Sequence, residues 1–245
     1  GIVPDHGVIL RSAFYNDNVR NTASPVTLID IVAASHWRIS QSYIADFAKG
    51  KGDLTSYGMF YKGAGNDNIF ERNIVNCEWR HQGGNRVGAS LGGGGTGQAF
   101  CRDGRCAAEQ FNSVIRNNIV MNCPEDVGIY INKGQHSTLN NNLVFNTRGI
   151  DIRFQQSSVK LFNNIIDGRV LTRGGASVES FSNLNSLTNA LMLESEAKKV
   201  YDGIYRGDFS LSSIERVLSV EPEELHKAGQ GICGGLHKES RLPQV

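Results

Sequence analysis

The sequence has little proline, no long apolar run and almost no net charge. Five prolines occur among 245 residues, and no apolar run approaches the roughly 18 residues that a membrane-spanning helix needs. The net charge of +1 argues against a nucleic-acid-binding protein, which usually carries a basic surplus. The composition is otherwise typical of a globular protein, with 40% hydrophobic and 20% charged residues. We therefore expect neither a membrane nor a nucleic acid as a partner.

The N-terminus and the cysteines do not assign a compartment. The first ten residues, GIVPDHGVIL, lack the basic and apolar regions of a signal peptide, although a chain that starts at Gly1 could have lost a leader. Cys101 and Cys106 bracket the tight turn CRDGRC, where a local disulfide and two free thiols are open alternatives. Cys77 and Cys123 lie in hydrophobic contexts typical of buried free thiols. The redox environment therefore stays open.

The sequence is rich in glycine and asparagine, and the asparagines recur in a repeated unit. The unit consists of an apolar residue, a pair of polar residues, and then Asn-Ile or Asn-Leu. Its clear copies are IFERNIVNC, VIRNNIVMNC, LNNNLVFNT and LFNNIIDG, and its fainter copies are ISQSYIADF and VESFSNLNS. The aligned asparagines are Asn73, Asn118, Asn142, Asn164 and Asn183, and the last three steps are 24, 22 and 19 residues. Each unit is followed by a short alternating run such as GMFYKG or GIYINKG. Alternation with a period of two predicts strands rather than helices.

Two short strands per repeat, with asparagine and glycine at the corners, predict an all-β parallel β-helix over residues 1–185. Each coil of such a solenoid buries its apolar face only by stacking on its neighbours. Asparagine suits a corner because it tolerates the left-handed backbone region, and its amide can bond the same residue in the coils above and below. A β-sandwich would show closer, less uniform turns and no asparagine register.

Two regions depart from the repeat. The 45-residue step from Asn73 to Asn118 exceeds one coil, so LGGGGTGQAFCRDGRC predicts a Gly/Cys-rich loop insertion around residues 92–110, directly after the strand VGASL. This loop does not indicate a nucleotide site, because no helix and no Lys-Ser or Lys-Thr follows its glycines. Residues 186–245 lose the asparagine register and contain helix formers, which predicts a partly helical tail that caps the C-terminal end.

Alternation within the second strand of each repeat predicts one polar face. Its outward positions would form two neighbouring columns, with residues about 4.8 Å apart from coil to coil. One column comprises Lys62, Gly92, Asn132, Arg153 and Arg173, and the other Phe60, Ser90, Tyr130, Asp151 and Leu171. Cationic, amide and aromatic groups on a flat face suit an extended acidic sugar chain, and the alternative is an ordinary solvated sheet face.

Several segments resemble right-handed parallel β-helix proteins of the pectate-lyase-like superfamily. They are YGMFYKGAGNDNIFERNIV, VGASLGGGGTG, CRDGRC, IRNNIVMNCPEDVGIYINK and NTRGIDIRF, which lie within residues 56–173, and GICGGLHKESR near the end. The resemblance is closest to uncharacterised bacterial β-helix repeat proteins related to the alginate lyase and chondroitinase B family. It implies a right-handed solenoid, an acidic polysaccharide or oligosaccharide as partner, and a secreted or periplasmic location rather than a cytoplasmic one.

The resemblance further implies polysaccharide-lyase activity on a uronate-containing chain. In that family a lysine abstracts the proton next to the uronate carboxylate, and an arginine assists as charge develops. Lys62 matches the lysine of that family. Gly92 stands near the position of the family's arginine, so Arg153 or Arg102 would take the role of that arginine. Tyr130 would protonate the departing oxygen. The expected sugar-binding residues are Ser90, Arg102, Asn132, Asp151 and Arg173.

The sequence assigns no metal or other cofactor. Cys101 and Cys106 lack the second pair of ligands that a zinc site needs. Chondroitinase B-like enzymes hold calcium with two glutamates just before the lysine, and here Gly58 and Phe60 occupy those places. Calcium therefore lacks its expected acidic ligands.

Two other functions remain open besides the lyase. A glycoside hydrolase on the same scaffold would use Asp151 together with Asp126 or Glu125. A non-catalytic module would bind glycan without cleaving it or serve as a structural spacer. In either case an uncovered first coil would expose strand edges and favour association into a homo-oligomer.

Overall fold

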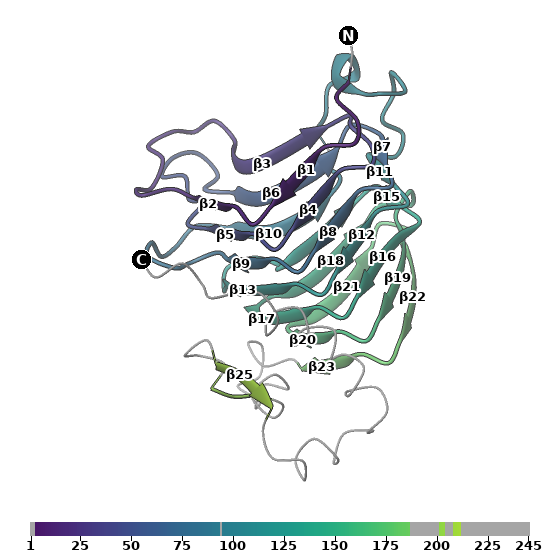
Figure 1. Cartoon of the computed structure of the whole chain (residues 1–245). Helices are drawn as coiled ribbons and strands as arrows, with labels where there is room; N and C mark the ends of the chain where they lie inside the picture. The colour runs from purple at the N-terminus through teal and green to yellow at the C-terminus, as the bar shows by residue number, and fades with distance from the viewer. Residues whose placement is uncertain (1–2, 94, 187–200, 204–207, 212–245) are drawn as a thin grey trace.

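The computed structural model describes residues 3–93, 95–186, 201–203 and 208–211 (Figure 1). Within these ranges the regular structure is β-strand, apart from the short 3-10 helix η1 (Gln98–Phe100). The strands of the main sheets all pair in parallel. The predicted all-β fold is confirmed, and the parallel pairing is consistent with the predicted stacking of coils.

Three parallel sheets contain most of the strands. The first sheet contains β1 (Val8–Leu10), β4 (Arg38–Ser40), β8 (Ile69–Glu71), β12 (Val114–Arg116), β16 (Ser137–Asn140), β19 (Ser158–Phe162) and β22 (Ser177–Phe181). The second contains β2 (Ala13–Tyr15), β5 (Tyr43–Ala45), β9 (Ile74–Asn76), β13 (Ile119–Cys123), β17 (Leu143–Thr147), β20 (Ile165–Asp167) and β23 (Leu184–Ser186). The third contains β3 (Val26–Val32), β6 (Ser56–Lys62), β10 (Arg86–Leu91), β14 (Ile129–Asn132), β18 (Gly149–Arg153) and β21 (Arg169–Arg173).

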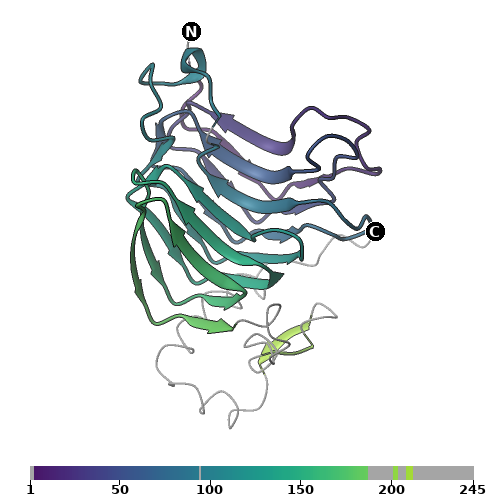
Figure 2. The same cartoon turned by 180° about the vertical axis from the view of Figure 1, so that it is seen from behind.

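The chain passes through the first, second and third sheets in turn and then begins the next circuit. Neighbouring strands in a sheet are therefore one circuit apart, and seen from behind they lie one above another (Figure 2). A small parallel sheet, β7 (Gly65–Asn66), β11 (Gln110–Phe111) and β15 (Gly134–Gln135), follows the third sheet in three circuits. Inward side chains of the three main sheets meet in one core. The residues predicted to point inward from β6, β14 and β18 are fully buried: Met59, Tyr61, Ile129, Ile131, Ile150 and Ile152.

The predicted asparagine register forms a continuous hydrogen-bonded ladder at the corner between the first and second sheets. The Oδ1 atom of Asn118 accepts hydrogen bonds from the backbone N–H and the Nδ2 of Asn73, at 2.9 and 3.2 Å. Asn118 bonds to Asn142 in the same way, and the ladder continues to Asn164 and Asn183. Each asparagine also donates Nδ2 to a backbone carbonyl, as Asn118 does to the carbonyl of Phe70. The ladder therefore satisfies buried polar groups that would otherwise be costly.

The left-handed residue of each corner is the one before the ladder residue. Its φ lies between 50° and 56° in every described circuit, as at Arg72, Asn117 and Asn141. The expectation that the aligned asparagine itself adopts this conformation is therefore wrong, because its side chain must point inward to bond the neighbouring circuits. The faint copy ISQSYIADF is a true corner, where Ser42 takes the ladder position and donates its backbone N–H to Asn73.

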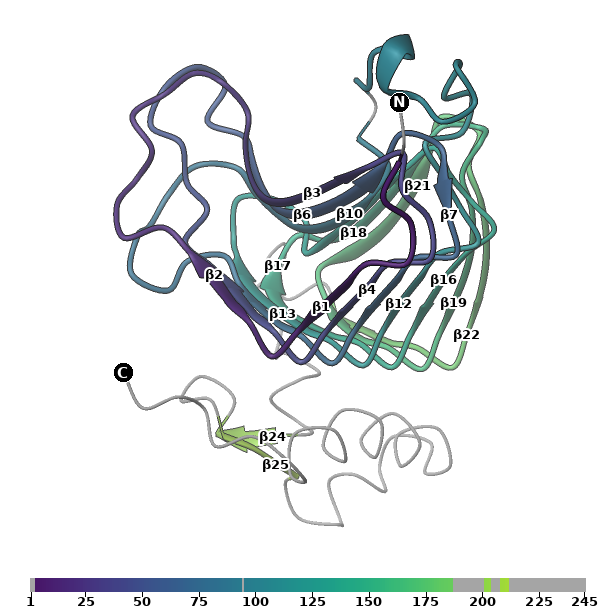
Figure 3. The ribbon, with the colours of Figure 1, turned by 45° about the horizontal axis from the view of Figure 1, so that its top comes forward.

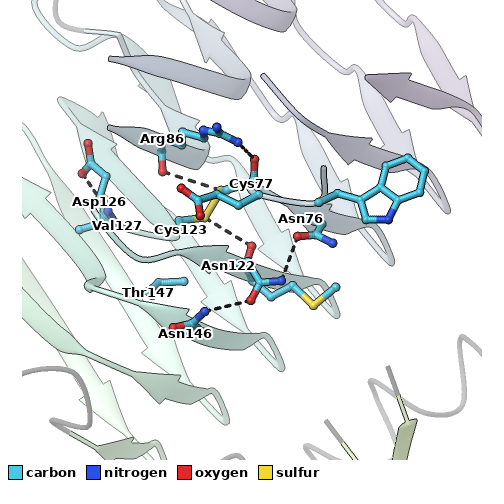
Figure 4. Close-up of a disulfide and its surroundings, with 12 residues drawn as sticks. Asn76, Cys77, Arg86, Asn122, Cys123, Asp126, Val127, Asn146 and Thr147 are labelled. Atoms are coloured by element: carbon cyan, nitrogen blue, oxygen red, sulfur yellow. Dashed lines mark hydrogen bonds between the residues drawn. A yellow bond between two sulfur atoms is a disulfide. The ribbon is translucent and has the colours of Figure 1, made fainter. Parts of the chain in front are cut away.

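Both pairs of cysteines form disulfides. Cys101 and Cys106 close the CRDGRC turn, which resolves the alternative left open by the sequence. The expectation that Cys77 and Cys123 are free buried thiols is wrong, because these residues are bonded to each other (Figure 4). Cys77 follows β9 and Cys123 ends β13, and these two strands lie in adjacent circuits. The Cα atoms of the two cysteines are therefore 5.1 Å apart, although 46 residues separate them in sequence.

The predicted C-terminal tail lies largely outside the described residues. Its described parts are β24 (Tyr201–Gly203) and β25 (Asp208–Leu211), which pair antiparallel rather than forming helices. Among the described residues, no helix is long and apolar enough to cross a membrane.

Candidate functional site on the third sheet

The outer face of the third sheet has projecting segments on both sides. Residues 16–25, 46–55 and 77–85 connect the second sheet to β3, β6 and β10. Residues 92–109, which contain η1, follow β10 before the chain reaches β11. Figure 3 shows the first group as purple and blue loops at the left of β3, β6 and β10, and η1 at their upper right. Residues 92–109 begin directly after β10, which contains the strand VGASL.

The two predicted columns lie in register on this face. Phe60, Ser90, Tyr130, Asp151 and Leu171 are consecutive partners across the sheet. In the neighbouring column Asn132, Arg153 and Arg173 are consecutive partners, and Lys62 pairs with Val32 on the other side. Residues from six separate stretches of sequence are therefore brought onto one surface.

Lys62 is held in an ion pair that the sequence reasoning missed. Its Nζ lies 2.9 Å from Oδ2 of Asp30 on β3 and 4.9 Å from the centre of the Phe60 ring. The side chain is 21% exposed, so solvent and a ligand still reach it. Asp30 lies outside the segments that carry the family resemblance, but the alternation of VTLIDIV would have placed it on the outer face.

The glycine-rich loop is fastened beside Lys62. Gly92 has a φ of 87°, and a Cβ there would lie 1.8 Å from the carbonyl oxygen of Asn132, so only glycine fits. The buried carboxylate of Glu109 accepts hydrogen bonds from the Gly63 N–H at 3.1 Å and the Thr96 hydroxyl at 2.7 Å. Glu109 thus ties the loop to the residue that follows Lys62, a role with no signal in the sequence.

Arg102 is engaged away from the predicted columns. Its guanidinium makes two hydrogen bonds to the carboxylate of Asp5, at 2.7 and 2.8 Å, and a third to the Ala33 carbonyl at 3.1 Å. This contact holds the pKa of Asp5 well below its usual range. Arg102 therefore fastens the N-terminal segment to the insertion, and its charge is already neutralised by Asp5.

Tyr130, Asn132 and Arg153 form one polar group on β14 and β18. Nδ2 of Asn132 donates to the Tyr130 hydroxyl oxygen at 3.1 Å, while Oδ1 of Asn132 is buried with no partner among the described residues. Burial raises the pKa of Tyr130, against the opposing effect of its hydrogen bond with Arg153. Tyr130 therefore keeps its proton at neutral pH.

Asp151 and Arg173 form a close ion pair across adjacent circuits. The Nη2 of Arg173 lies 2.6 Å from Asp151 Oδ2, and its Nε lies 3.0 Å from Oδ1. The hydrogen bonds that Arg173 donates to the carboxylate of Asp151 raise the pKa of Arg173. Ser90, by contrast, is fully buried and donates its hydroxyl to the Gly92 carbonyl at 2.7 Å. Ser90 therefore does not reach the outer surface where a sugar would bind.

Asp126 and Tyr57 lie at the end of this face where the strands of the third sheet begin. Asp126 precedes β14, and burial, with a smaller contribution from the charge of Asp151, raises its pKa. Burial also raises the pKa of Tyr57 to about 12, and the charge of Asp126 makes the next largest contribution. Both side chains are therefore biased toward their uncharged forms. Tyr57 was not selected from the sequence, where it reads as an ordinary strand residue.

The described residues offer no set of ligands for calcium at the place that the family resemblance implies. Gly58 and Phe60 provide no oxygen ligand there, and the nearest carboxylate, Asp30, is paired with Lys62. The group Cys101, Asp103 and Cys106 is the one cluster of metal-binding residue types found among the described residues, and its two cysteines are joined in a disulfide. No reaction step through a metal is derived for this face.

No protein-family model, curated protein or solved structure matches this chain.

Proposed function

We propose that this chain is a right-handed parallel β-helix protein of the pectate-lyase-like superfamily, and that it acts on a uronate-containing polysaccharide by β-elimination. Three parallel sheets visited in turn, stacked circuits and a buried asparagine ladder support the solenoid. The outer face of the third sheet would bind the polysaccharide between the flanking loops.

The observation that carries this proposal is the in-register placement of cationic and amide side chains along the third sheet. Lys62, Asn132, Arg153 and Arg173 occupy one outward column, with Tyr130 beside it. The cations of this column would bind carboxylates along a uronate chain, and Lys62 and Arg173 would leave Asp30 and Asp151 to do so. Asn132 Oδ1 adds a buried acceptor without a partner, which a sugar hydroxyl would satisfy.

The chemistry of elimination assigns a role to three of these residues. A base removes the proton on the carbon next to the uronate carboxylate, the C–O bond at the following carbon breaks, and a double bond forms between the two carbons. Lys62 would take the proton, Arg153 would neutralise the carboxylate, and Tyr130 would give its phenolic proton to the departing oxygen. Lys62 acts as a base only when uncharged, so the pair with Asp30 must separate when substrate binds.

The ion pair between Lys62 and Asp30 favours a second candidate, a glycan-binding module without catalysis. A lysine that stays in an ion pair, as Lys62 does with Asp30 at 2.9 Å, binds carboxylates but removes no proton. In this candidate the same column of residues provides affinity and specificity alone.

The deciding experiment measures the ultraviolet absorbance of newly formed unsaturated uronate. The protein is incubated with alginate, pectate, chondroitin, dermatan and heparin-type chains, with and without calcium. We expect an increase with one of these chains that is abolished in Lys62→Ala and retained in Lys160→Ala, a control lysine that is 66% exposed on the first sheet. A flat trace combined with binding that weakens in Lys62→Ala would support the module instead. A flat trace with no binding to any chain would overturn both.

A further inference from the structure

A row of two histidines and an aspartate lies at the corner that precedes the first sheet. His6, His36 and Asp67 stand two residues before β1, β4 and β8, so they occupy the same position in three successive circuits. The N–H of His6 donates to the carbonyl of Ser35 at 3.0 Å, and that of His36 donates to the carbonyl of Asn66 at 2.9 Å. Each residue of the row has a φ between 54° and 64° and an exposed side chain. The backbone therefore sets these side chains next to one another on the surface.

The side chains of this row contact one another from circuit to circuit. The imidazole rings of His6 and His36 are stacked, with their centres 4.7 Å apart and their planes 9° from parallel. Nδ1 of His36 lies 3.9 Å from Oδ2 of Asp67, and these two side chains are 45% and 49% exposed. Two imidazoles and a carboxylate from three separate stretches of sequence are thus brought together where solvent and ions reach them.

Imidazole nitrogen and carboxylate oxygen are ligands that zinc and copper ions take in proteins. Zn–N bonds are about 2.0–2.1 Å long, which puts two ligand atoms of one tetrahedral ion about 3.3 Å apart. The 3.9 Å between His36 Nδ1 and Asp67 Oδ2 is close to that separation. The ligand atoms form a row rather than a closed cluster, so the exposed ring of His6 has to tilt out of the stack to meet the same ion.

The charged groups beside the row are engaged with other partners. Asp5, next to the first histidine, accepts two hydrogen bonds from the guanidinium of Arg102 at 2.7 and 2.8 Å. Arg38, two residues after the second histidine, is paired with the buried carboxylate of Glu71. Neither group competes for the ligand atoms of the row, and neither places an unpaired positive charge beside a bound cation.

We propose that His6, His36 and Asp67 bind one divalent transition-metal ion of the zinc and copper class, through one nitrogen of each imidazole and one oxygen of the carboxylate. Water completes the coordination of this exposed ion. The ion fastens the first circuit to the next two at the edge of the first sheet, where β1 pairs with β4 alone. The site is separate from the glycan face on the third sheet, so its test needs no glycan.

The test uses the full chain with Zn²⁺ alone in calorimetry and with Cu²⁺ alone in electron paramagnetic resonance, which counts the bound imidazole nitrogens. Cys233→Ser is present in every protein so that its thiol does not compete for either ion. His6→Asn and His36→Asn each remove one imidazole. Asparagine suits this corner, because Asn112 occupies it in the fourth circuit with a φ of 48°. His136→Asn is the matched control, since His136 occupies the corner of the fifth circuit with a φ of 51°.

The reference protein should bind one Zn²⁺ per chain and give a Cu²⁺ spectrum with two imidazole nitrogens. His6→Asn and His36→Asn should each weaken Zn²⁺ binding by roughly 10- to 100-fold, the range known for groups that support a metal site, and leave one nitrogen in the spectrum. Asp67→Asn should weaken Zn²⁺ binding and keep both nitrogens, and the control should match the reference. Equal affinity in His36→Asn and the reference, a loss in the control, or no binding of either ion to the reference would overturn the proposal.

Discussion

Two connections between the main sheets differ in how much their length varies from circuit to circuit. The corner between the first and second sheets consists of two residues in every described circuit, from Arg11 and Ser12 to Ser182 and Asn183. The connection from the second sheet to the third spans residues 16–25 in the first circuit but only Arg148 or Gly168 in later ones. The corner is constrained by the interior along its whole length, whereas the connection has buried residues such as Phe47 only at its start.

The physical reason is what each connection has to satisfy. The corner residue Asn118 is fully buried and bonds the circuits on both sides, so any insertion would break the ladder. The longer connections project past the third sheet, and apart from buried residues at their start, such as Phe47 and Cys77, their length is free to change. The repeat is therefore set at the constant corner, and the surroundings of the candidate site are set by the variable connections.

The largest expected effect comes from breaking the constant corner. Asn142→Ala removes the acceptor of the Asn118 N–H and Nδ2, and it leaves the carbonyl of Ile115 without its donor. Because these groups are buried, unfolding free energy should fall by about 3–5 kcal/mol. Thermal or urea unfolding measures this loss. Asn140→Ala, on the outer side of β16, is the matched control, and equal losses in both variants would contradict the ladder's role.

An effect of comparable size is expected from the disulfide at the start of a variable connection. Cys77 and Cys123 are 46 residues apart in sequence. Replacing both by alanine should therefore lower the free energy of unfolding by about 4 kcal/mol, from the dependence of loop-closure entropy on loop length. The same replacement at Cys101 and Cys106, which are five residues apart, should cost about 2 kcal/mol. Chemical denaturation of the two double variants tests the order. A larger loss for the short loop would show that the insertion contributes more to stability than the stacked circuits do.

The smallest expected effects concern Asp126 and Asp5, whose contributions to stability should change with pH in opposite directions. Burial raises the pKa of Asp126 in the folded state, so its contribution to stability is present at low pH and is lost as the pH rises through the folded pKa. Asp126→Asn should therefore become progressively more stable than the wild type toward neutral pH. Arg102 lowers the pKa of Asp5, so the contribution of Asp5 is present above its unfolded pKa and is lost as the pH falls.

Melting temperature measured from pH 3 to pH 8 separates these two aspartates. Asp5→Asn should lose stability relative to the wild type as the pH rises, which is the reverse of Asp126→Asn. Asp103→Asn is not a suitable control, because backbone N–H groups of Cys106 and Arg105 lower the pKa of Asp103 as well. Parallel curves for Asp5→Asn and Asp126→Asn would show that their environments do not differ as the contacts indicate.

The sequence by itself determined the repeat, the strands and the direction of their side chains. Asn73 to Asn183 recur at the spacing of a circuit, and the inward set from Met59 to Ile152 follows directly from alternation. These features are local, because a period of two and a two-residue corner are expressed within about ten residues of sequence. The columns of the third sheet followed once the circuits were aligned.

Only the tertiary structure decided which groups on that surface are engaged. Lys62 meets Asp30, Arg102 meets Asp5 and Cys77 meets Cys123 across separations of 32, 97 and 46 residues. Arg148 pairs with Glu125 at 2.8 Å across a separation of 23 residues. Such pairings depend on how circuits stack and where loops fold back. No short stretch of sequence encodes either, because the partners are brought together only when the parallel sheets form.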